Sequence, residues 1–314
     1  MIRILFFALL LSVGMTPMTA LQAQSKQPNV QSLVDAGATA KVYKKTVDSK
    51  DQPVELKLYV FQPRDHRPSD RRPAIVFFFG GGWRNGSPAQ FRQHCIDLAQ
   101  KGMVAITADY RVSSRQGTKV THCVADAKSA IRWVRRHANE LGIHPDQVVA
   151  AGGSAGGHLA ASTGVVPGFD SDSSVKDGDD PISSVPNALA LFNPALVLWQ
   201  IEGQPALDQT RLNSLKQRIG DAPVKVSPYH HVKPGAPPTI IFHGTADKTV
   251  PYRTAAAFAE KMKRAGNRCE LKSYPDQGHG FFNHGRKGNN YAKTIQQLET
   301  FLVSLKFISP SNTP

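Results

Sequence analysis

The segment VVAAGGSAGG, residues 148–157, decides the fold of this chain. Its first four residues form a short apolar run of the kind found in strands that are buried on both faces. The pattern Gly-x-Ser-x-Gly follows at once and centres on Ser154. The small neighbours leave room for a sharp turn from strand to helix, which lifts the serine hydroxyl above the sheet and aims the first N–H groups of the helix at it. The pattern therefore predicts a nucleophilic serine.

Two other interpretations of this glycine-rich turn are a packing turn and a phosphate-binding loop. A dinucleotide-binding fingerprint requires Gly-x-Gly-x-x-Gly, and neither Gly152 nor Gly153 begins one. No Gly-Lys-Ser or Gly-Lys-Thr follows, as a P-loop requires. The position of the serine between a predicted strand and a predicted helix favours the nucleophile.

A serine hydroxyl becomes a strong nucleophile only beside a base that a carboxylate orients. His279 follows a predicted strand that ends at Tyr274, and Asp247 follows the predicted strand at residues 239–242. Asp276 is a rival for the acid, but it lies three residues before the histidine in the same loop, where we expect a turn residue. We favour Asp247 because it follows the carboxyl end of a strand, where the sites of parallel sheets assemble.

Short apolar runs alternate with helical patterns along most of the chain. Residues 124–141 carry apolar side chains at spacings of three and four, which indicates one face of a helix. The first two predicted strands flank a polar turn at 48–52 and are expected to pair. Strands are predicted at residues 41–47, 54–61, 74–79, 103–108, 147–151, 188–192 and 239–242, and in a run that ends at Tyr274. The alternation is typical of a mainly parallel sheet of eight strands with helices on both faces.

A run of three glycines follows the predicted strand at 74–79. The segment Phe79-Gly80-Gly81-Gly82-Trp83 resembles the HGGGW loop of the acetyl-esterase and feruloyl-esterase branch of the α/β-hydrolases, which is related to the hormone-sensitive-lipase-like esterases. Further matches lie at residues 109–111, 152–160, 243–251 and 278–282, so the resemblance spans about residues 54–305. The order Ser154, Asp247, His279 is also the order of the α/β-hydrolase triad.

The resemblance implies an α/β-hydrolase fold and a serine esterase. It places the oxyanion hole on the backbone N–H groups of Gly81, Gly82 and Ala155. Phe79 departs from the family, which usually has a histidine there that braces the loop. We expect the ring of Phe79 to brace the loop by packing, and the alternative is a loop with an altered substrate preference.

The chain divides into a short leader, one large domain and a tail. Residues 1–23 are predicted to be a signal peptide, because the apolar run at 4–13 is far shorter than the roughly 20 residues that span a bilayer. An uncleaved anchor is the alternative. An N-terminal extension is expected at 24–40, the α/β-hydrolase domain at 41–308 with cap segments at 168–186 and 200–232, and a C-terminal tail at 309–314. These boundaries predict a secreted or periplasmic protein that has no membrane partner after cleavage.

The composition limits the partners and cofactors. The 38 basic and 24 acidic residues leave a formal charge of +14, yet the basic segments lack the interleaved aromatic side chains that stack nucleic-acid bases. We expect no nucleic-acid partner. No CxxC or HExxH spacing occurs, so we expect neither a metal nor another cofactor. The sequence makes no prediction of the oligomeric state.

The chain has three cysteines, and export would expose them to an oxidising compartment. The helices that carry Cys95 and Cys123 each follow the carboxyl end of a predicted strand. We therefore expect these two residues near one edge of the sheet and hypothesise a disulfide between them, with Cys269 left as a free thiol.

The resemblance and the motifs together predict a secreted carboxylic-ester hydrolase that works through an acyl-enzyme. The resemblance points to acetyl or feruloyl groups on polysaccharides, or else to small esters. One alternative is an exopeptidase of the prolyl-oligopeptidase type, although the chain has no room for the propeller domain of those enzymes. Another is a non-catalytic protein that binds polysaccharide, which the charge of +14 alone supports.

Overall fold

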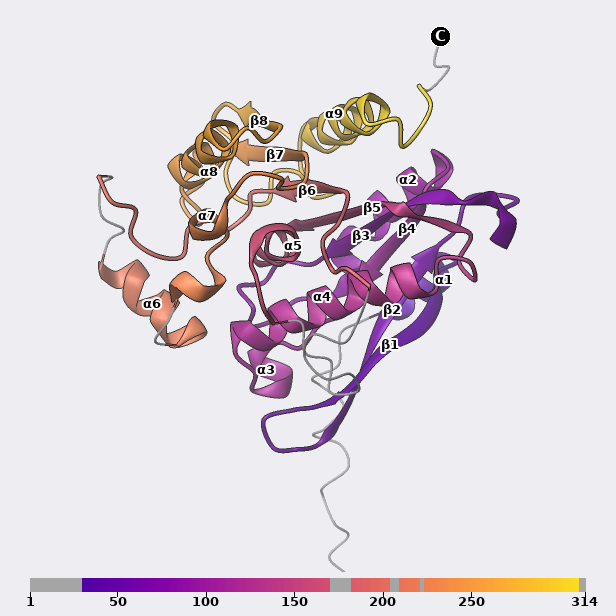
Figure 1. Cartoon of the computed structure of the whole chain (residues 1–314), viewed down its shortest axis with the longest axis horizontal. Coiled ribbons are helices and arrows are strands. Elements are labelled where there is room, and N and C mark those ends of the chain that lie inside the picture. The colour runs from indigo at the N-terminus through magenta and orange to yellow at the C-terminus, as the bar shows by residue number, and fades with distance from the viewer. Residues whose placement is uncertain (1–29, 170–181, 204–208, 221–222, 311–314) are drawn as a thin grey trace, which may run out of the picture.

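A single eight-stranded sheet forms the centre of the computed structural model, which describes residues 30–169, 182–203, 209–220 and 223–310 (Figure 1). The strands lie in the order β1-β2-β4-β3-β5-β6-β7-β8. Strand β2 is antiparallel to both of its neighbours, and all pairs from β4 to β8 are parallel. The bounds are β1 (Thr39–Val47), β2 (Pro53–Phe61), β3 (Arg72–Phe78), β4 (Val104–Ala108), β5 (Ile143–Gly153), β6 (Ala188–Phe192), β7 (Thr239–Gly244) and β8 (Cys269–Tyr274).

The central strands are buried on both faces because their sequences are continuously apolar. Along β3, Val76 and Phe78 pack on one side of the sheet and Ile75 and Phe77 pack on the other. This is the alternation that a strand imposes on successive side chains. The apolar runs that predicted these strands are thus explained by two separate cores, one on each face.

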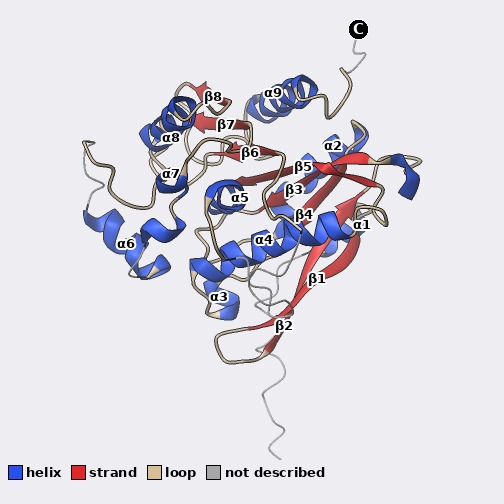
Figure 2. Cartoon of the chain, viewed as in Figure 1, coloured by secondary structure: helices blue, strands red, loops and turns tan. Residues whose placement is uncertain are grey.

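Helices cover both faces of the sheet (Figure 2). One face is covered by α4 (Val120–Arg136), α5 (Ala155–Val165) and α8 (Tyr252–Arg264). The other is covered by α1 (Gln31–Asp35), α2 (Arg92–Gln100) and α9 (Asn290–Ser304). Short elements connect them: α3 (Ser113–Gln116) and the 3-10 helices η2 (Pro68–Asp70) and η3 (Pro88–Phe91). Among the described residues, no helix has both the length and the hydropathy needed to cross a membrane.

A separate group of short helices lies beside the main layers. It comprises α6 (Gln209–Ile219), η4 (Pro223–Val226) and α7 (Pro228–His231), and we call residues 209–231 the cap. Figure 1 shows α6 outside the stacked layers, near α7. The cap falls within the segment 200–232 that the sequence predicted to cover a site.

The predicted sheet of eight mainly parallel strands and the antiparallel pairing of the first two strands are confirmed. The N-terminal boundary differs, because β1 begins at Thr39 and the side chain of Leu33 in α1 is fully buried. The end of the expected extension is therefore part of the core. The expected signal peptide, most of the segment at 168–186 and most of the tail lie outside the described residues.

The expected disulfide between Cys95 and Cys123 is wrong, since all three cysteines are free. Cys95 on α2 belongs to one core, whereas Cys123 on α4 belongs to the core on the opposite face. Both helices do follow the carboxyl ends of strands, but the sheet lies between them. The sequence correctly indicated that both helices follow strand ends at one edge of the sheet. It could not indicate which face of the sheet each helix covers.

Candidate active site

A cavity of about 910 Å³ lies where the loops after β3, β5, β6, β7 and β8 meet. These strands are parallel neighbours, so their carboxyl ends lie along one edge of the sheet. The loops bring Ser154 and His279 to the wall of the cavity together with the glycines at 80–82. Residues of α6 complete the wall from the cap side.

Ser154 lies between β5 and α5 in a backbone conformation that few non-glycine residues adopt, with φ 54° and ψ −116°. The turn is held by hydrogen bonds, because the Ser154 N–H donates to the carbonyl of Phe192 at 2.9 Å and its own carbonyl accepts from His158 N–H at 3.0 Å. A Cβ at Gly156 would collide with the backbone of Phe78. Glycine at that position is therefore what allows the turn to pack against β3.

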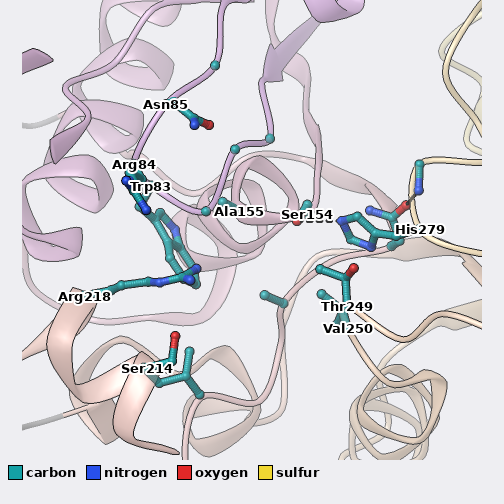
Figure 3. A pocket seen from close by; sticks show the side chains of 18 of the residues that line it. Trp83, Arg84, Asn85, Ser154, Ala155, Ser214, Arg218, Thr249, Val250 and His279 are labelled. Carbon is teal, nitrogen blue, oxygen red and sulfur yellow. Dashed lines mark hydrogen bonds between the residues drawn. The ribbon is translucent and has the colours of Figure 1, made fainter. Parts of the chain in front are cut away.

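The structure brings Ser154, His279 and Asp247 together in one chain of contacts. Figure 3 shows Ser154 beside His279. Nε2 of His279 lies 3.0 Å from Oγ of Ser154, and Nδ1 lies 2.7 Å from Oδ2 of Asp247. With the proton on Nδ1, the ring donates to the carboxylate and Nε2 is left to accept the serine proton. Asp276 does not contact the imidazole: it is exposed, and its N–H donates to Oγ1 of Thr245.

Asp247 is buried and held by several donors. Its Oδ1 accepts the N–H groups of Thr249 and Val250, each at 2.8 Å. Burial raises the pKa of Asp247, but hydrogen bonds from His243, His279 and the Val250 N–H together outweigh it and hold this pKa below its ordinary value. The carboxylate therefore stays ionised beside the imidazole. Sequence reasoning did not assign His243 this contact with Asp247.

The glycines after β3 present free backbone donors to the cavity. Gly81 and Gly82 have φ values of 126° and 62°, which glycine adopts without strain. The Gly80 N–H is already used, since it donates to Oε1 of Gln90 at 2.6 Å. Within the described part of the chain, the N–H groups of Gly81, Gly82 and Ala155 have no protein acceptor. These three groups are the ones that the family resemblance assigned to the oxyanion hole.

Gln90 connects the glycine loop with the loop that carries the histidine. While its Oε1 accepts from Gly80, its Nε2 donates to Oδ1 of Asn283 at 3.0 Å. Asn283 donates in turn to the carbonyl of Gly280, and the Gly280 N–H donates to Asn193. Sequence reasoning missed these polar residues, because no pattern in the chain links positions so far apart.

Phe79 and Trp83 brace the two ends of the same loop. The ring of Phe79 is fully buried and stacks on Tyr110 with a centroid separation of 4.1 Å, as expected from packing, and it does not line the cavity. Trp83 donates through Nε1 to Nδ1 of His158, whose Nε2 donates to the carbonyl of Val226 in the cap. Burial lowers the pKa of His158 to about 4, so this ring is neutral and structural.

No cluster of metal-binding side chains accompanies the cavity. Across residues 30–169, 182–203, 209–220 and 223–310, no group of three or more histidine, cysteine, aspartate or glutamate side chains is arranged to hold a metal ion. The cavity wall presents the hydroxyl of Ser154, the imidazole of His279 and the three free backbone donors.

The parallel sheet, the turn at Ser154 and the chain of contacts to His279 and Asp247 define an α/β-hydrolase with a serine-histidine-aspartate site. Residues 58–262, more than half of the chain, match the family model BD-FAE. The chain belongs to this family. Residues 220–308 also match the dienelactone hydrolase family.

Solved structures of esterase 2 from Thermogutta terrifontis are similar over most of their length. The native enzyme is 55% identical, with 88% of this chain and 95% of that chain covered at a TM-score of 0.79. The butyrate-bound form is 54% identical, with coverage of 88% and 97% and a TM-score of 0.78.

Curated relatives are more distant and longer. Esterase LipC of Mycobacterium tuberculosis is 29% identical over 253 residues, which is 76% of this chain. The matched part spans 60% of LipC, 45% of the probable carboxylic ester hydrolase LipM and 50% of esterase LipQ. Together the relatives support the assignment of this chain as a carboxylic-ester hydrolase.

Proposed function

We propose that the chain hydrolyses carboxylic esters through a covalent acyl-enzyme. The observation that carries this proposal is the position of His279, whose two ring nitrogens contact Ser154 and Asp247. In the first half of the reaction, Nε2 takes the serine proton while Oγ attacks the ester carbonyl. The bond to the alcohol oxygen then breaks, and the imidazolium returns the proton to the leaving alcohol.

The second half repeats these steps with water. His279 takes a proton from the water, the hydroxide attacks the acyl carbon, and the proton returns to Oγ of Ser154 as the acid leaves. The carbonyl oxygen carries negative charge twice, and the free N–H groups of Gly81, Gly82 and Ala155 supply preorganised donors for it. Asp247 orients the imidazole and stabilises its charged form.

For the substrate, we propose short acyl groups, such as acetyl, on an alcohol that is part of a polysaccharide, with feruloyl as the larger candidate. Structures of the Thermogutta terrifontis enzyme with propionate and with butyrate bound support a short acyl group. The signal-like sequence at residues 1–23 supports a polymer outside the cytoplasm and a secreted or periplasmic location. A cavity of about 910 Å³ is within the range of small-molecule sites, which supports both the short acyl groups and the larger feruloyl group as candidates.

Labelling with a fluorophosphonate probe tests the nucleophile. The wild-type chain should be labelled, and Ser154→Ala should not. Ser162→Ala is the matched control, because it removes a buried serine of α5 that lies one turn beyond His158 and outside the cavity. Undiminished labelling of Ser154→Ala would refute the assignment, and no labelling of the wild-type chain would favour the non-catalytic polysaccharide binder.

A substrate panel tests the chemistry. Nitrophenyl acetate, butyrate and octanoate, methyl ferulate and acetylated xylan should separate the acyl and alcohol preferences. We expect the acetyl and butyryl esters to be cleaved fastest and acetate to be released from the xylan. Release of amine from dipeptidyl nitroanilides, without ester cleavage, would support the exopeptidase instead.

A further inference from the structure

The described lining of the cavity carries basic side chains and no acidic ones. Its lining includes Arg84, Arg218 and Lys248, and none of the described residues that line it is an aspartate or glutamate. Arg84 directly follows the glycine loop and Trp83, whereas Arg218 comes from α6 in the cap. Two separate elements thus direct guanidinium groups to one cavity.

Within the described residues, Arg84 and Arg218 lack the carboxylate partners that hold Arg111 and Arg115. The guanidinium of Arg111 binds Asp126, and that of Arg115 binds Asp109, in both cases through two hydrogen bonds. Within the described residues, neither Arg84 nor Arg218 forms an ion pair or a side-chain hydrogen bond. A guanidinium is always charged, and its planar fork matches a carboxylate.

The guanidinium of Arg218 lies directly against the glycine loop. A Cβ built on Gly82 would be 2.9 Å from Nη1 of Arg218, so the end of the arginine side chain lies within contact distance of this glycine. Because the N–H of Gly82 is one of the free donors, the arginine lies next to the proposed oxyanion hole. Figure 3 shows Arg84 and Arg218 on one side of Ser154 and His279 on the other.

This arrangement determines which part of an ester can reach the arginines. His279 must return a proton to the leaving alcohol, so the alcohol portion lies on the histidine side of Ser154. The acyl chain is the part of the ester that can extend away from His279, and Arg84 and Arg218 lie on that side of Ser154 in Figure 3. We propose that the two arginines bind a carboxylate at the far end of the acyl chain, so that half-esters of dicarboxylic acids are hydrolysed in preference to uncharged esters of the same length. The inference rests on the proposed ester hydrolysis.

Matched pairs of esters measure the preference. Monomethyl glutarate, adipate and pimelate carry a terminal carboxylate at increasing distance from the ester. The uncharged partner of each is the same methyl ester with a carboxamide in place of the carboxylate. Methanol release gives kcat/KM for both. For the best chain length, we expect the charged ester to be hydrolysed at least about tenfold more efficiently than its partner, which is the usual scale for a hydrogen-bonded charge. About 0.5 M sodium chloride should reduce this ratio by screening.

Substitutions assign the preference to the two arginines. Arg218→Gln and Arg84→Gln should each lower the ratio of charged to uncharged kcat/KM several-fold, and the double variant should bring it close to one. The matched control is Lys225→Gln, which removes the same charge from an exposed position of η4 that does not line the cavity. The control should keep the ratio of the wild-type chain.

The outcomes separate this inference from the proposed function. If nitrophenyl acetate is not hydrolysed either, the proposed function fails. If nitrophenyl acetate is hydrolysed and neither ester of any pair is, the anion site alone is overturned. If uncharged esters are hydrolysed and no half-ester is preferred, only the anion site is overturned. An equal loss of preference in Lys225→Gln would also overturn it, because the net charge and not the site would then be responsible. Acetyl esters of hydroxycarboxylic acids carry the charge on the alcohol, and an arginine-dependent preference for these alone would overturn the acyl-side assignment.

Discussion

The two sides of the cavity are built in different ways. On the sheet side, Asp247 and the loops around Ser154 are buried, and each is held by several hydrogen bonds. On the cap side, Arg218 and Ser214 come from one short helix, and the arginine is exposed and has no side-chain partner among the residues that the structure describes. The contrast separates two tasks: the core fixes the geometry of bond cleavage, while the cap contributes side chains that can be exchanged without disturbing it. Substitutions on the sheet side should therefore affect the reaction far more.

The largest effect should come from Ser154→Ala. Without the nucleophile, kcat for a nitrophenyl ester should fall by a factor on the order of 10⁴ or more, and His279→Ala should cost about the same because the triad acts as a unit. Ser214→Ala is the control on the cap side of the same cavity. It should stay within a few fold of the wild-type chain, and a loss as large as that of Ser154→Ala would break the contrast between the two sides.

The next largest effect should come from Asp247→Asn. The amide cannot stabilise the imidazolium and favours the wrong tautomer of His279, so kcat should fall by a factor on the order of 10³ to 10⁴. Asp276→Asn alters an exposed carboxylate three residues before the histidine and should remain near wild type. Steady-state kinetics of both variants decide between the two acids. Near-normal turnover in Asp247→Asn with a collapse in Asp276→Asn would reverse the assignment.

A third effect concerns the free energy of unfolding and its dependence on the buried His94, which packs under the sheet side of the cavity. His94 is fully buried among aromatic rings, and burial lowers its pKa to about 3. The unfolded chain binds a proton at this residue below about pH 6.5 and the folded chain does not, so stability is lost as the pH falls from about 6.5 toward 3. At pH 4.5 the loss should be about 2 to 3 kcal/mol.

The substitution His94→Phe should remove this part of the pH dependence. Urea unfolding at pH 7 and pH 4.5 gives the free energy of unfolding of each chain, and the difference between the two pH values should shrink in the variant. His144→Gln, at the partly exposed start of β5, is the control and should not shrink it. An unchanged difference in His94→Phe would show that the folded chain accommodates a charged imidazole at this site.

A smaller effect should come from Gln90→Leu, which removes the link between the glycine loop and the histidine loop. The donors of the oxyanion hole remain, but they lose their brace, so kcat should fall about tenfold with KM little changed, less than the 10² to 10³ lost with a donor itself. Gln90→Glu keeps an acceptor for Gly80 and removes the donor to Asn283. Recovery in this variant would show that the bond to Gly80 is the important one, whereas a rise in KM alone would contradict a positioning role.

The smallest effect should come from Phe79→His. The ring packs on Tyr110 and does not line the cavity, so kcat should stay within a few fold, and the ratio of kcat/KM for acetyl and butyryl esters should stay constant. A change in this ratio of about tenfold, equivalent to roughly 1.4 kcal/mol, would show that the ring reaches the acyl group.

The sequence predicted those parts of the site that depend on local geometry. The turn at Ser154 needs small neighbours next to it in the chain, and Asp247 and His279 each follow a predicted strand, so all three leave a local signal. The contacts of Gln90 and Asn283 leave none, because they depend on how two distant loops approach each other. The same reason explains the error for Cys95 and Cys123: a pattern shows where a helix begins but not which face of the sheet it covers.

Sequence reasoning also could not predict that Arg218 lines the cavity. The cap segment could be recognised from its interruption of the alternating strands and helices, but nothing in its composition indicates which of its basic residues lines the cavity. The packing of α6 beside the sheet decides which basic residue lines the cavity. The close approach of Arg218 to Gly82 becomes visible only in the folded structure.

The three free cysteines can report how the helical layers separate from the sheet. Burial raises the pKa of every one of them, to about 12 for Cys269, so their thiols are neither accessible nor ionised in the folded chain. Modification by a thiol reagent must therefore wait for the surrounding layer to separate from the sheet. Cys95 reports on the layer formed by α2, and Cys123 and Cys269 report on the opposite layer. Equal modification rates would mean that both layers come apart in one event, and unequal rates would identify the layer that opens first.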